Sequence, residues 1–286
     1  MDRDTMMDPC LFDEAIEREY MPSKYGFNLQ GKSRMQRYFH LCYVQNERTT
    51  LSVKHISYGP DERQGLNVMY DSQYNSEATV LVFVHGGYWI EGDRHMHNFI
   101  ANGLHIHNVN VVSMGYRLAG KGADLQRCID DVILGIQKVQ EIFPTTKIHL
   151  AGHSAGTHLI LCALTKLRTL EKIGKVFCVS GIYSLEKIAN TSIGVQLQLN
   201  KDQAQMFSVS PQAICYSHVQ IKVIVGQYDP PAFQQQAQEF AQQLRIEGYL
   251  NEHVHVLPNE DHFSLIENLF FEDSALTQFF AKCCRA

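Results

Sequence analysis

The feature that most constrains the fold is the segment "KIHLAGHSAGTHL", residues 147–159, because it requires a tight turn between a strand and a helix. Its first part is an apolar run typical of a buried strand, and its last part opens a helical pattern. Residues 152–156 between them match G-x-S-x-G, a turn that lifts a serine hydroxyl off a sheet and leaves a helix N-terminus beneath it. Side chains two residues to either side of the serine would clash in such a turn, which accounts for both glycines. Ser154 is therefore a candidate nucleophile.

The apolar run before the serine is one of several that alternate with helical patterns. Near-continuous Val, Ile and Leu is what strands need when helices cover both faces of a parallel sheet. Residues 124–143 place apolar side chains at i, i+3, i+4 and i+7, which predicts a helix. Strand and helix in alternation predict an α/β fold with a mainly parallel central sheet and helices on both faces. The expected strands are 78–85, 109–116, 147–152, 175–181 and 221–229, and further helices are expected at 233–247 and 274–284.

The chain has 286 residues, which is within reach of one large α/β domain, and no second domain is evident. We therefore expect a single domain over residues 1–286. Residues 184–214 interrupt the alternation, which predicts an insertion that forms a small cap. Residues 1–40 have a mixed pattern and precede the sheet.

Composition and charge exclude several classes of function. Lys and Arg number 25 against 30 Asp and Glu, a net charge of −5, and no basic tract occurs, so neither nucleic acid nor a membrane surface is expected as a partner. The eight cysteines form no C-x-x-C motif. The first ten residues, "MDRDTMMDPC", lack the apolar core of a signal peptide, and no apolar run is long enough to span a membrane. A reduced, cytoplasmic protein is expected. No dinucleotide fingerprint, P-loop or zinc spacing occurs, so we expect no cofactor; a homodimer is left open.

A second glycine motif strengthens the interpretation of Ser154. The stretch "VLVFVHGGYWIEGDRH", residues 80–95, places two glycines directly after an expected strand. When a serine attacks a carbonyl carbon, negative charge develops on the oxygen, and backbone N–H groups must already be in place to stabilise it. An HGG-type loop supplies such donors together with the residue after the nucleophile. We expect an oxyanion hole formed by the amides of Gly86, Gly87 and Ala155, and the alternative is an ordinary glycine turn.

A catalytic serine also needs a base, and the base needs an acid that orients it. With this motif the chain order is serine, then Asp or Glu, then His. "VIVGQYDPP" ends an expected strand with Asp229 in a turn, and "VHVLPNEDHFSLIE" places His262 in a polar loop after a last strand-like run. The expected catalytic residues are therefore Ser154 as nucleophile, His262 as base and Asp229 as orienting acid.

Other residues compete for these roles. Asp202 is a weaker alternative to Asp229, and Glu260 and Asp261 lie too close to His262 in sequence to reach its far nitrogen easily. Four histidines precede the serine as two H-x-H pairs, which raises the alternative of a metal site: His95, His97, His105 and His107. Residues two apart do not share a helix face and no Cys or carboxylate cluster accompanies them, so no metal is expected. Three histidines close to the motifs are expected to be structural: His85, His153 and His158.

Several segments together resemble one known family. "HGGYW", "GHSAG", "DPPAFQQQA" and "DHFSLIE" are similar to segments of kynurenine formamidases, also called arylformamidases, of the α/β-hydrolase superfamily. "REYMPSKY" resembles a further segment of that family, and the similarity runs from about residue 15 to 270. HGG and G-x-S-x-G occur in many esterases and indicate only the superfamily. The match to the family is narrowed by the Tyr-Trp pair after HGG and by the segments "DPPAFQQQA" and "DHFSLIE". The resemblance implies an α/β-hydrolase fold.

The resemblance also implies a reaction, the hydrolysis of N-formyl-L-kynurenine to kynurenine and formate in tryptophan catabolism. The formyl side of the pocket would then be tight, and the side that holds the aromatic leaving group would be wide. Tyr88, Trp89 and Tyr183 are the expected aromatic wall, with core packing as the alternative for each. Two other functions stay open: a general carboxylesterase or deacetylase with the same machinery, and a non-catalytic binding protein of the hydrolase fold.

Overall fold

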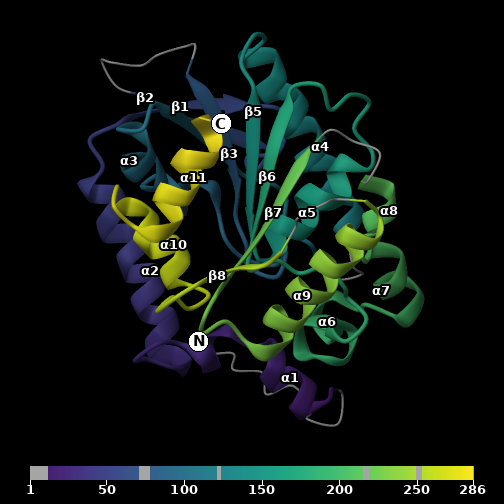
Figure 1. Ribbon diagram of the computed structural model, residues 1–286. Coiled ribbons are helices and arrows are strands. Elements are labelled where there is room, and N and C mark those ends of the chain that lie inside the picture. The colour runs from purple at the N-terminus through teal and green to yellow at the C-terminus, as the bar shows by residue number, and fades with distance from the viewer. Residues whose placement is uncertain (1–11, 71–77, 121–123, 215–218, 249–252, 286) are drawn as a thin grey trace.

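A mainly parallel β-sheet forms the middle layer of the molecule (Figure 1). The computed structural model describes residues 12–70, 78–120, 124–214, 219–248 and 253–285. Within these ranges the strand order is β1-β2-β4-β3-β5-β6-β7-β8; β2 is antiparallel to both neighbours and the other pairs are parallel. The strands are β1 (Ser52–Ser57), β2 (Gly65–Tyr70), β3 (Thr79–Val84), β4 (Val109–Met114), β5 (Ile148–His153), β6 (Ile173–Val179), β7 (Gln220–Gly226) and β8 (His255–Leu257).

Helices cover both faces of this sheet, as Figure 1 shows. Each face has its own apolar core, one beneath α4, α5 and α9 and the other beneath α2, α3, α10 and α11. The predicted α/β fold, with a mainly parallel central sheet and helices on both faces, is therefore confirmed (Figure 1). The helices are α2 (Gly31–Arg48), α3 (Ile100–His105), α4 (Leu125–Ile142), α5 (Ala155–Leu164), α9 (Pro231–Ile246), α10 (Ser264–Glu267) and α11 (Ala275–Arg285), with the 3₁₀ helices η3 (Arg94–His97) and η5 (Asn268–Phe270).

Strand β3 shows why its sequence is apolar without interruption. Val80, Val82 and Val84 contribute to the core under α4 and α5, whereas Leu81 and Phe83 contribute to the core under α2 and α3. Successive side chains of a strand point to opposite faces, so a strand covered on both sides needs apolar residues at every position. The same burial on both faces holds for β4 and β5, in which every residue is buried.

The segment before the sheet, which has only a mixed pattern in the sequence, forms α1 (Glu14–Tyr20), the 3₁₀ helix η2 (Pro22–Tyr25) and α2. Residues 184–214 form the 3₁₀ helix η4 (Ile188–Asn190), α6 (Ser192–Leu197), α7 (Lys201–Phe207) and α8 (Pro211–Ile214). The two segments are joined, because Glu17 on α1 accepts hydrogen bonds from the Ser192 amide at 2.8 Å and the Ser192 hydroxyl at 2.7 Å. A single domain with a cap at 184–214 stays a prediction.

The carboxyl ends of β3, β5, β6 and β7 meet at the lower edge of the sheet in Figure 1. Residues of different strands come together at such an edge, and in open α/β sheets this is where ligands bind. The loops that follow β3, β5 and β7 carry the glycine pair, Ser154 and Asp229, and His262 follows β8, the neighbour of β7. None of the helices in the described ranges is both long enough and apolar enough to cross a membrane.

Candidate active site

Ser154 lies between β5 and α5 with φ 54° and ψ −119°, a conformation that is strained for a residue with a side chain. The surrounding chain approaches the two neighbouring glycines too closely for any side chain. A Cβ at Gly152 would lie 2.4 Å from the Thr157 nitrogen, and one at Gly156 would lie 2.1 Å from the Val84 carbonyl oxygen. The turn places Ser154 at the N-terminus of a ten-residue helix, whose dipole favours negative charge there.

Gly86 and Gly87 follow β3 and lie against the serine turn. A Cβ at Gly86 would lie 2.9 Å from the Ser154 Cβ, and Gly87 has φ 106°, which favours glycine. His85 Nδ1 lies 2.7 Å from the Gly86 carbonyl oxygen. Burial lowers the pKa of His85 to about 4, so its ring is neutral near pH 7 and donates the Nδ1 hydrogen to that carbonyl. Ala155, the third expected oxyanion donor, is buried and begins α5.

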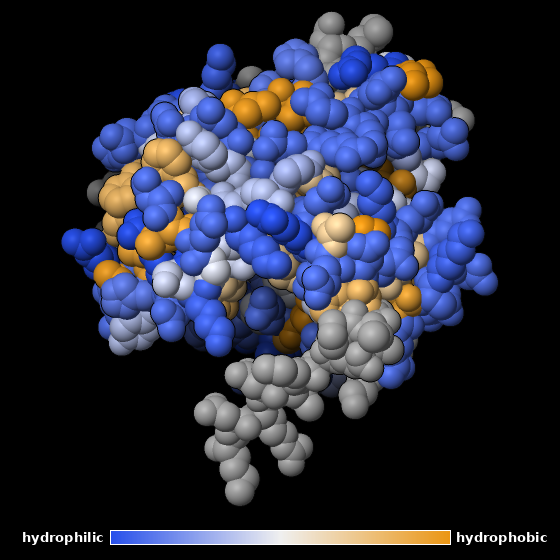
Figure 2. Space-filling view, turned by 90° about the horizontal axis from the view of Figure 1, so that it is seen from below, coloured by the Kyte–Doolittle hydropathy of each residue, from blue (hydrophilic) through white to orange (hydrophobic). Residues whose placement is uncertain are grey.

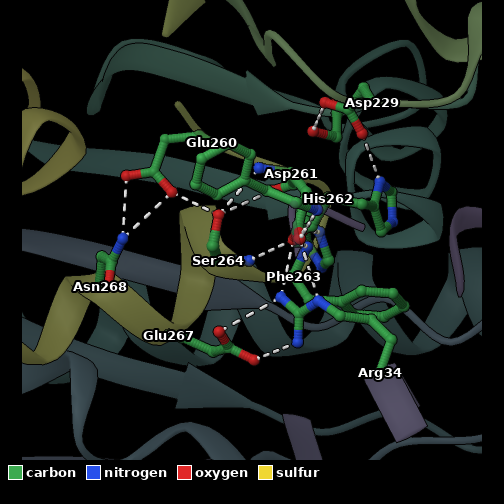
Figure 3. Close-up of polar contacts among 12 residues, drawn as sticks. Arg34, Asp229, Glu260, Asp261, His262, Phe263, Ser264, Glu267 and Asn268 are labelled. Carbon is green, nitrogen blue, oxygen red and sulfur yellow. Dashed lines mark hydrogen bonds and ion pairs between the residues drawn. The ribbon is translucent and has the colours of Figure 1, made fainter. Parts of the chain in front are cut away.

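His262 and Asp229 form a buried pair, with His262 Nδ1 2.8 Å from Asp229 Oδ1 (Figure 3). The other carboxylate oxygen of Asp229 accepts hydrogen bonds from the Ser180 hydroxyl at 2.5 Å and the Gly226 amide at 2.7 Å. Since an ionised carboxylate only accepts hydrogen bonds, Nδ1 carries the proton and Nε2 has a lone pair. A histidine in this tautomer can take a proton from a hydroxyl. Sequence reasoning missed Ser180, although its place after β6 was a usable signal.

Ser154, His262, Gly86 and Gly87 line one cavity of about 220 Å³. Figure 2 looks onto this end of the molecule, and a hollow opens there. The cavity is mainly apolar, and its size suits a small molecule. Sequence reasoning did not assign the wall that the N-terminal segment and α2 contribute, which consists of Met21, Pro22, Ser23, Met35, Tyr38 and Phe39.

Of the three aromatic residues expected to contact substrate, Tyr88 lines the cavity and the other two do not. Trp89 is fully buried, and its Nε1 donates to Nδ1 of His158 at 3.1 Å. Tyr183 is also buried, and its ring stacks on Phe240 of α9 with centroids 4.2 Å apart. The structure therefore places Trp89 and Tyr183 in the core, because a partner inside the protein is available to each ring.

His153, which was expected to be structural, lines the cavity next to His262. Its Nε2 lies 2.9 Å from the His262 carbonyl oxygen, and the two ring centroids are 4.5 Å apart. Burial, followed by the proximity of His262, lowers the pKa of His153 well below its ordinary value. The neutral ring donates to that carbonyl and so links the loop that carries the candidate base to the turn that carries Ser154.

The histidines of the H-x-H pairs do not form a common cluster. His97 is buried at the cavity wall, its Nε2 lies 2.7 Å from the Tyr38 hydroxyl, and burial lowers its pKa to about 3. His95 is exposed and has its ring 5.3 Å from that of His55. Across the described ranges, no three His, Cys, Asp or Glu side chains are arranged so that they could hold a metal ion.

A buried ion cluster fixes the backbone next to His262. Arg34 of α2 donates to both carboxylate oxygens of Asp261, at 2.7 and 2.9 Å, and to Glu267 at 2.6 Å (Figure 3). Asp261 also accepts hydrogen bonds from the amides of Phe263 and Ser264, at 2.9 and 2.8 Å. Sequence reasoning considered Asp261 only as an alternative acid, whereas here it holds the His262 loop on α2.

The two acids of this cluster respond differently to burial. Burial acts to raise the pKa of Asp261, but the hydrogen bonds from Arg34 and from the backbone outweigh it and leave the pKa below its ordinary value. Burial also raises the pKa of Glu267, and there the hydrogen bonds from Arg34 offset it only in part. Arg34 is therefore the cation that forms hydrogen bonds with both buried carboxylates, and Arg37 adds a weaker favourable charge at Glu267.

We expect Arg34→Met to lower the free energy of unfolding by about 3–5 kcal/mol, because it leaves two buried carboxylates without their partner. Urea denaturation monitored by circular dichroism measures this loss. Lys32→Met is the control, since Lys32 lies on the same helix and is exposed; a change below about 0.5 kcal/mol is expected there. Equal small losses in both variants would contradict the proposed importance of the ion cluster.

Comparison with known proteins finds relatives over nearly the whole chain. Residues 81–264 match a family model described as α/β-hydrolase fold. Kynurenine formamidase of Danio rerio is 28% identical over 281 residues, which cover 94% of this chain and 95% of that protein. Kynurenine formamidase of Drosophila melanogaster is 27% identical over 287 residues, which cover 92% and 95%. The structure of the hyperthermophilic esterase from Pyrobaculum calidifontis matches with a TM-score of 0.66 at 17% identity, over 89% of this chain and 93% of that one. The predicted resemblance to kynurenine formamidases is confirmed.

Proposed function

Because the chain belongs to the α/β-hydrolase family, we propose that it is a serine hydrolase that cleaves the formamide bond of N-formyl-L-kynurenine. The products are kynurenine and formate, as the step would occur in tryptophan catabolism. The observation that carries this proposal is the shared cavity of Ser154, His262 and the glycine loop, with His262 Nδ1 2.8 Å from Asp229. Relatives named for this activity, similar over 94% and 92% of the chain, support the choice of substrate.

The proposed reaction begins when Ser154 Oγ attacks the formyl carbon and His262 Nε2 takes the hydroxyl proton. The amides of Gly86, Gly87 and Ala155 stabilise the oxyanion, and each such donor is worth about 3 kcal/mol of barrier. The intermediate collapses as His262 returns the proton to the departing aryl amine, so that the C–N bond breaks and a formyl-serine remains. Water, activated by His262, then releases formate and restores the hydroxyl.

The setting of Ser154 supports a small acyl group. A Cβ at Gly86 would already lie 2.9 Å from the Ser154 Cβ, so little room is left between the glycine loop and the nucleophile. A formyl carbon carries only hydrogen beside its oxygen and nitrogen, which suits this narrow space. The apolar walls from α2, among them Met35 and Phe39, suit the aromatic leaving group.

The proposed activity predicts a preference among substrates. We expect kcat/KM for N-formyl-L-kynurenine to exceed that for p-nitrophenyl acetate and p-nitrophenyl butyrate, measured at one pH and ionic strength with background hydrolysis subtracted. The reason is that binding of the aromatic amino acid contributes to the transition state only in the first case. Esters preferred by a wide margin would contradict the proposal and favour a general carboxylesterase.

Acyl size gives a second prediction for the same site. Replacing the formyl group of the substrate by acetyl adds one methyl group beside Gly86, and we expect kcat/KM to fall by about 10- to 200-fold. Comparison of N-formyl- and N-acetyl-L-kynurenine measures this ratio directly, because the leaving group is identical. Equal rates for the two amides would contradict a site that is tight on the acyl side.

The cellular setting is also part of the proposal. The six cysteines within the described residues are all free thiols, and four of them are buried. Buried free thiols persist most readily where the surroundings are reducing, so we place the enzyme in the cytoplasm.

A further inference from the structure

The cavity of the proposed active site is unbalanced in charge. Among the described residues that line it, Glu91 is the one acid, and neither Lys nor Arg occurs. His97 and His153 also line it, but burial lowers the pKa of His97 to about 3 and that of His153 well below its ordinary value. Both rings are therefore neutral near pH 7. The walls thus offer a ligand one negative charge and no lysine or arginine in the part of the chain that is described.

Glu91 is held close to the proposed oxyanion loop. Its amide donates to the Gly87 carbonyl oxygen at 3.0 Å, and its Cγ lies 3.0 Å from the position that a Cβ on Gly87 would occupy. The backbone turn therefore sets where the Glu91 side chain begins, and the side chain reaches the cavity wall from there.

The Glu91 carboxylate has no hydrogen bond or ion pair with any residue in the described ranges. Burial raises its pKa above the ordinary value, and no cation or hydrogen-bond donor there offsets this effect. The residue as a whole is still exposed, so it contacts both solvent and the cavity. A partly buried carboxylate without a partner is stabilised when a ligand brings a cation to it.

Resting on the proposed function, we propose that Glu91 binds an ammonium group on the side chain of the substrate. The preferred substrates are then aryl formamides whose side chain carries an ammonium group and no free carboxylate. N-Formyl-L-kynurenine carries both groups: its ammonium group pairs with Glu91, whereas its carboxylate is repelled by Glu91 and meets no lysine or arginine in the described lining. A carboxylate that loses water without gaining a partner weakens binding.

Three substrates with the same aryl formamide test this charge preference: N-formyl-L-kynurenine, its carboxamide of nearly equal shape, and N-formyl-2-aminoacetophenone, which lacks the amino-acid end. For the wild-type protein we expect kcat/KM for the carboxamide to exceed that for the zwitterion about tenfold, since the site is partly exposed and solvent screens the charges. Glu91→Gln is expected to lower the ratio of carboxamide to acetophenone about tenfold and to bring the ratio of carboxamide to zwitterion close to one. Ratios are compared because a general loss of activity cancels in them.

Glu141→Gln is the matched control, because it removes the same charge from an exposed side chain of α4 that does not line the cavity. Its substrate ratios should equal those of the wild-type protein. If all three formamides are hydrolysed and the ratios are equal in the wild-type protein and Glu91→Gln, the role of Glu91 is overturned and the proposed function stands. If none of the three is hydrolysed while esters are, the proposed function is overturned and this inference with it.

Discussion

Replacing Ser154 by alanine is expected to lower kcat/KM for N-formyl-L-kynurenine by about 10⁴- to 10⁶-fold while the fold is kept. The change removes one oxygen from the cavity and leaves the turn, the glycine contacts and α5 in place. Without the hydroxyl, His262 has no nucleophile to activate, and only the oxyanion hole and binding remain to assist water. Release of the aryl amine, followed by its absorbance, measures the loss.

Thermal unfolding of the Ser154→Ala variant separates chemistry from folding, and we expect its Tm to match that of the wild-type protein. Ser113→Ala is the control, since Ser113 is a buried serine of β4 whose hydroxyl donates to the Arg94 carbonyl and does not line the cavity. It should keep turnover within a few-fold of the wild-type value. Near-normal turnover by Ser154→Ala would show that another residue is the nucleophile, with Ser23 of the cavity wall the next to test.

The second large effect is expected for Asp229→Asn, about 10⁴-fold in kcat at pH 7. The hydrogen bonds around Asp229 dictate how an asparagine must sit. The Gly226 amide and the Ser180 hydroxyl both point at one oxygen, so the asparagine oxygen takes that position and its NH₂ faces His262. His262 Nδ1 must then accept a hydrogen bond, which moves the ring proton to Nε2 and removes the lone pair that Ser154 needs.

Measuring Tm beside kcat tests this effect. The substitution is nearly isosteric, so the asparagine can keep the hydrogen bonds from Ser180 and Gly226, and only the contact with His262 changes. We expect a small change in Tm beside the large loss in kcat. Asp202→Asn is the control, since Asp202 was the alternative acid and lies exposed in the first turn of α7. Full activity of Asp229→Asn with loss of activity in Asp202→Asn would show that Asp202, and not Asp229, is the orienting acid.

The central strands could be predicted from sequence because burial on both faces demands an unbroken apolar run, as in β3 and β5. β1 carries no such signal. It lies at the edge of the sheet, most of its residues are exposed, and its sequence "SVKHIS" is largely polar. The helices α1 and α2 were not predicted from the mixed pattern before residue 40 for a related reason. Of the seven residues of α1 only Tyr20 is buried, and α2 buries the polar side chains of Arg34 and Gln45 beside Tyr38 and Cys42, so neither helix has a plain apolar face.

Some residues of the candidate site are fixed by local backbone geometry, and others by contacts between distant parts of the chain. Ser154 and the paired glycines could be proposed because a strained turn and close backbone contact restrict the residues at those positions. Arg34 could not, because its partner Asp261 lies 227 residues further along the chain and only folding brings them together. Whether Trp89 lies at the cavity or in the core could not be predicted for the same reason. His158, which accepts the hydrogen bond of its indole nitrogen, is 69 residues away.

The measurement that tests the central claim most directly is titration of the protein with a serine-reactive organophosphonate. Intact mass and peptide mapping follow the adduct, and formamidase activity on N-formyl-L-kynurenine is assayed at each step. We expect one adduct per chain on Ser154, activity that falls in proportion to labelling, and no adduct in Ser154→Ala. Complete labelling with formamidase activity retained, or an adduct on another residue that abolishes it, would contradict Ser154 as the nucleophile.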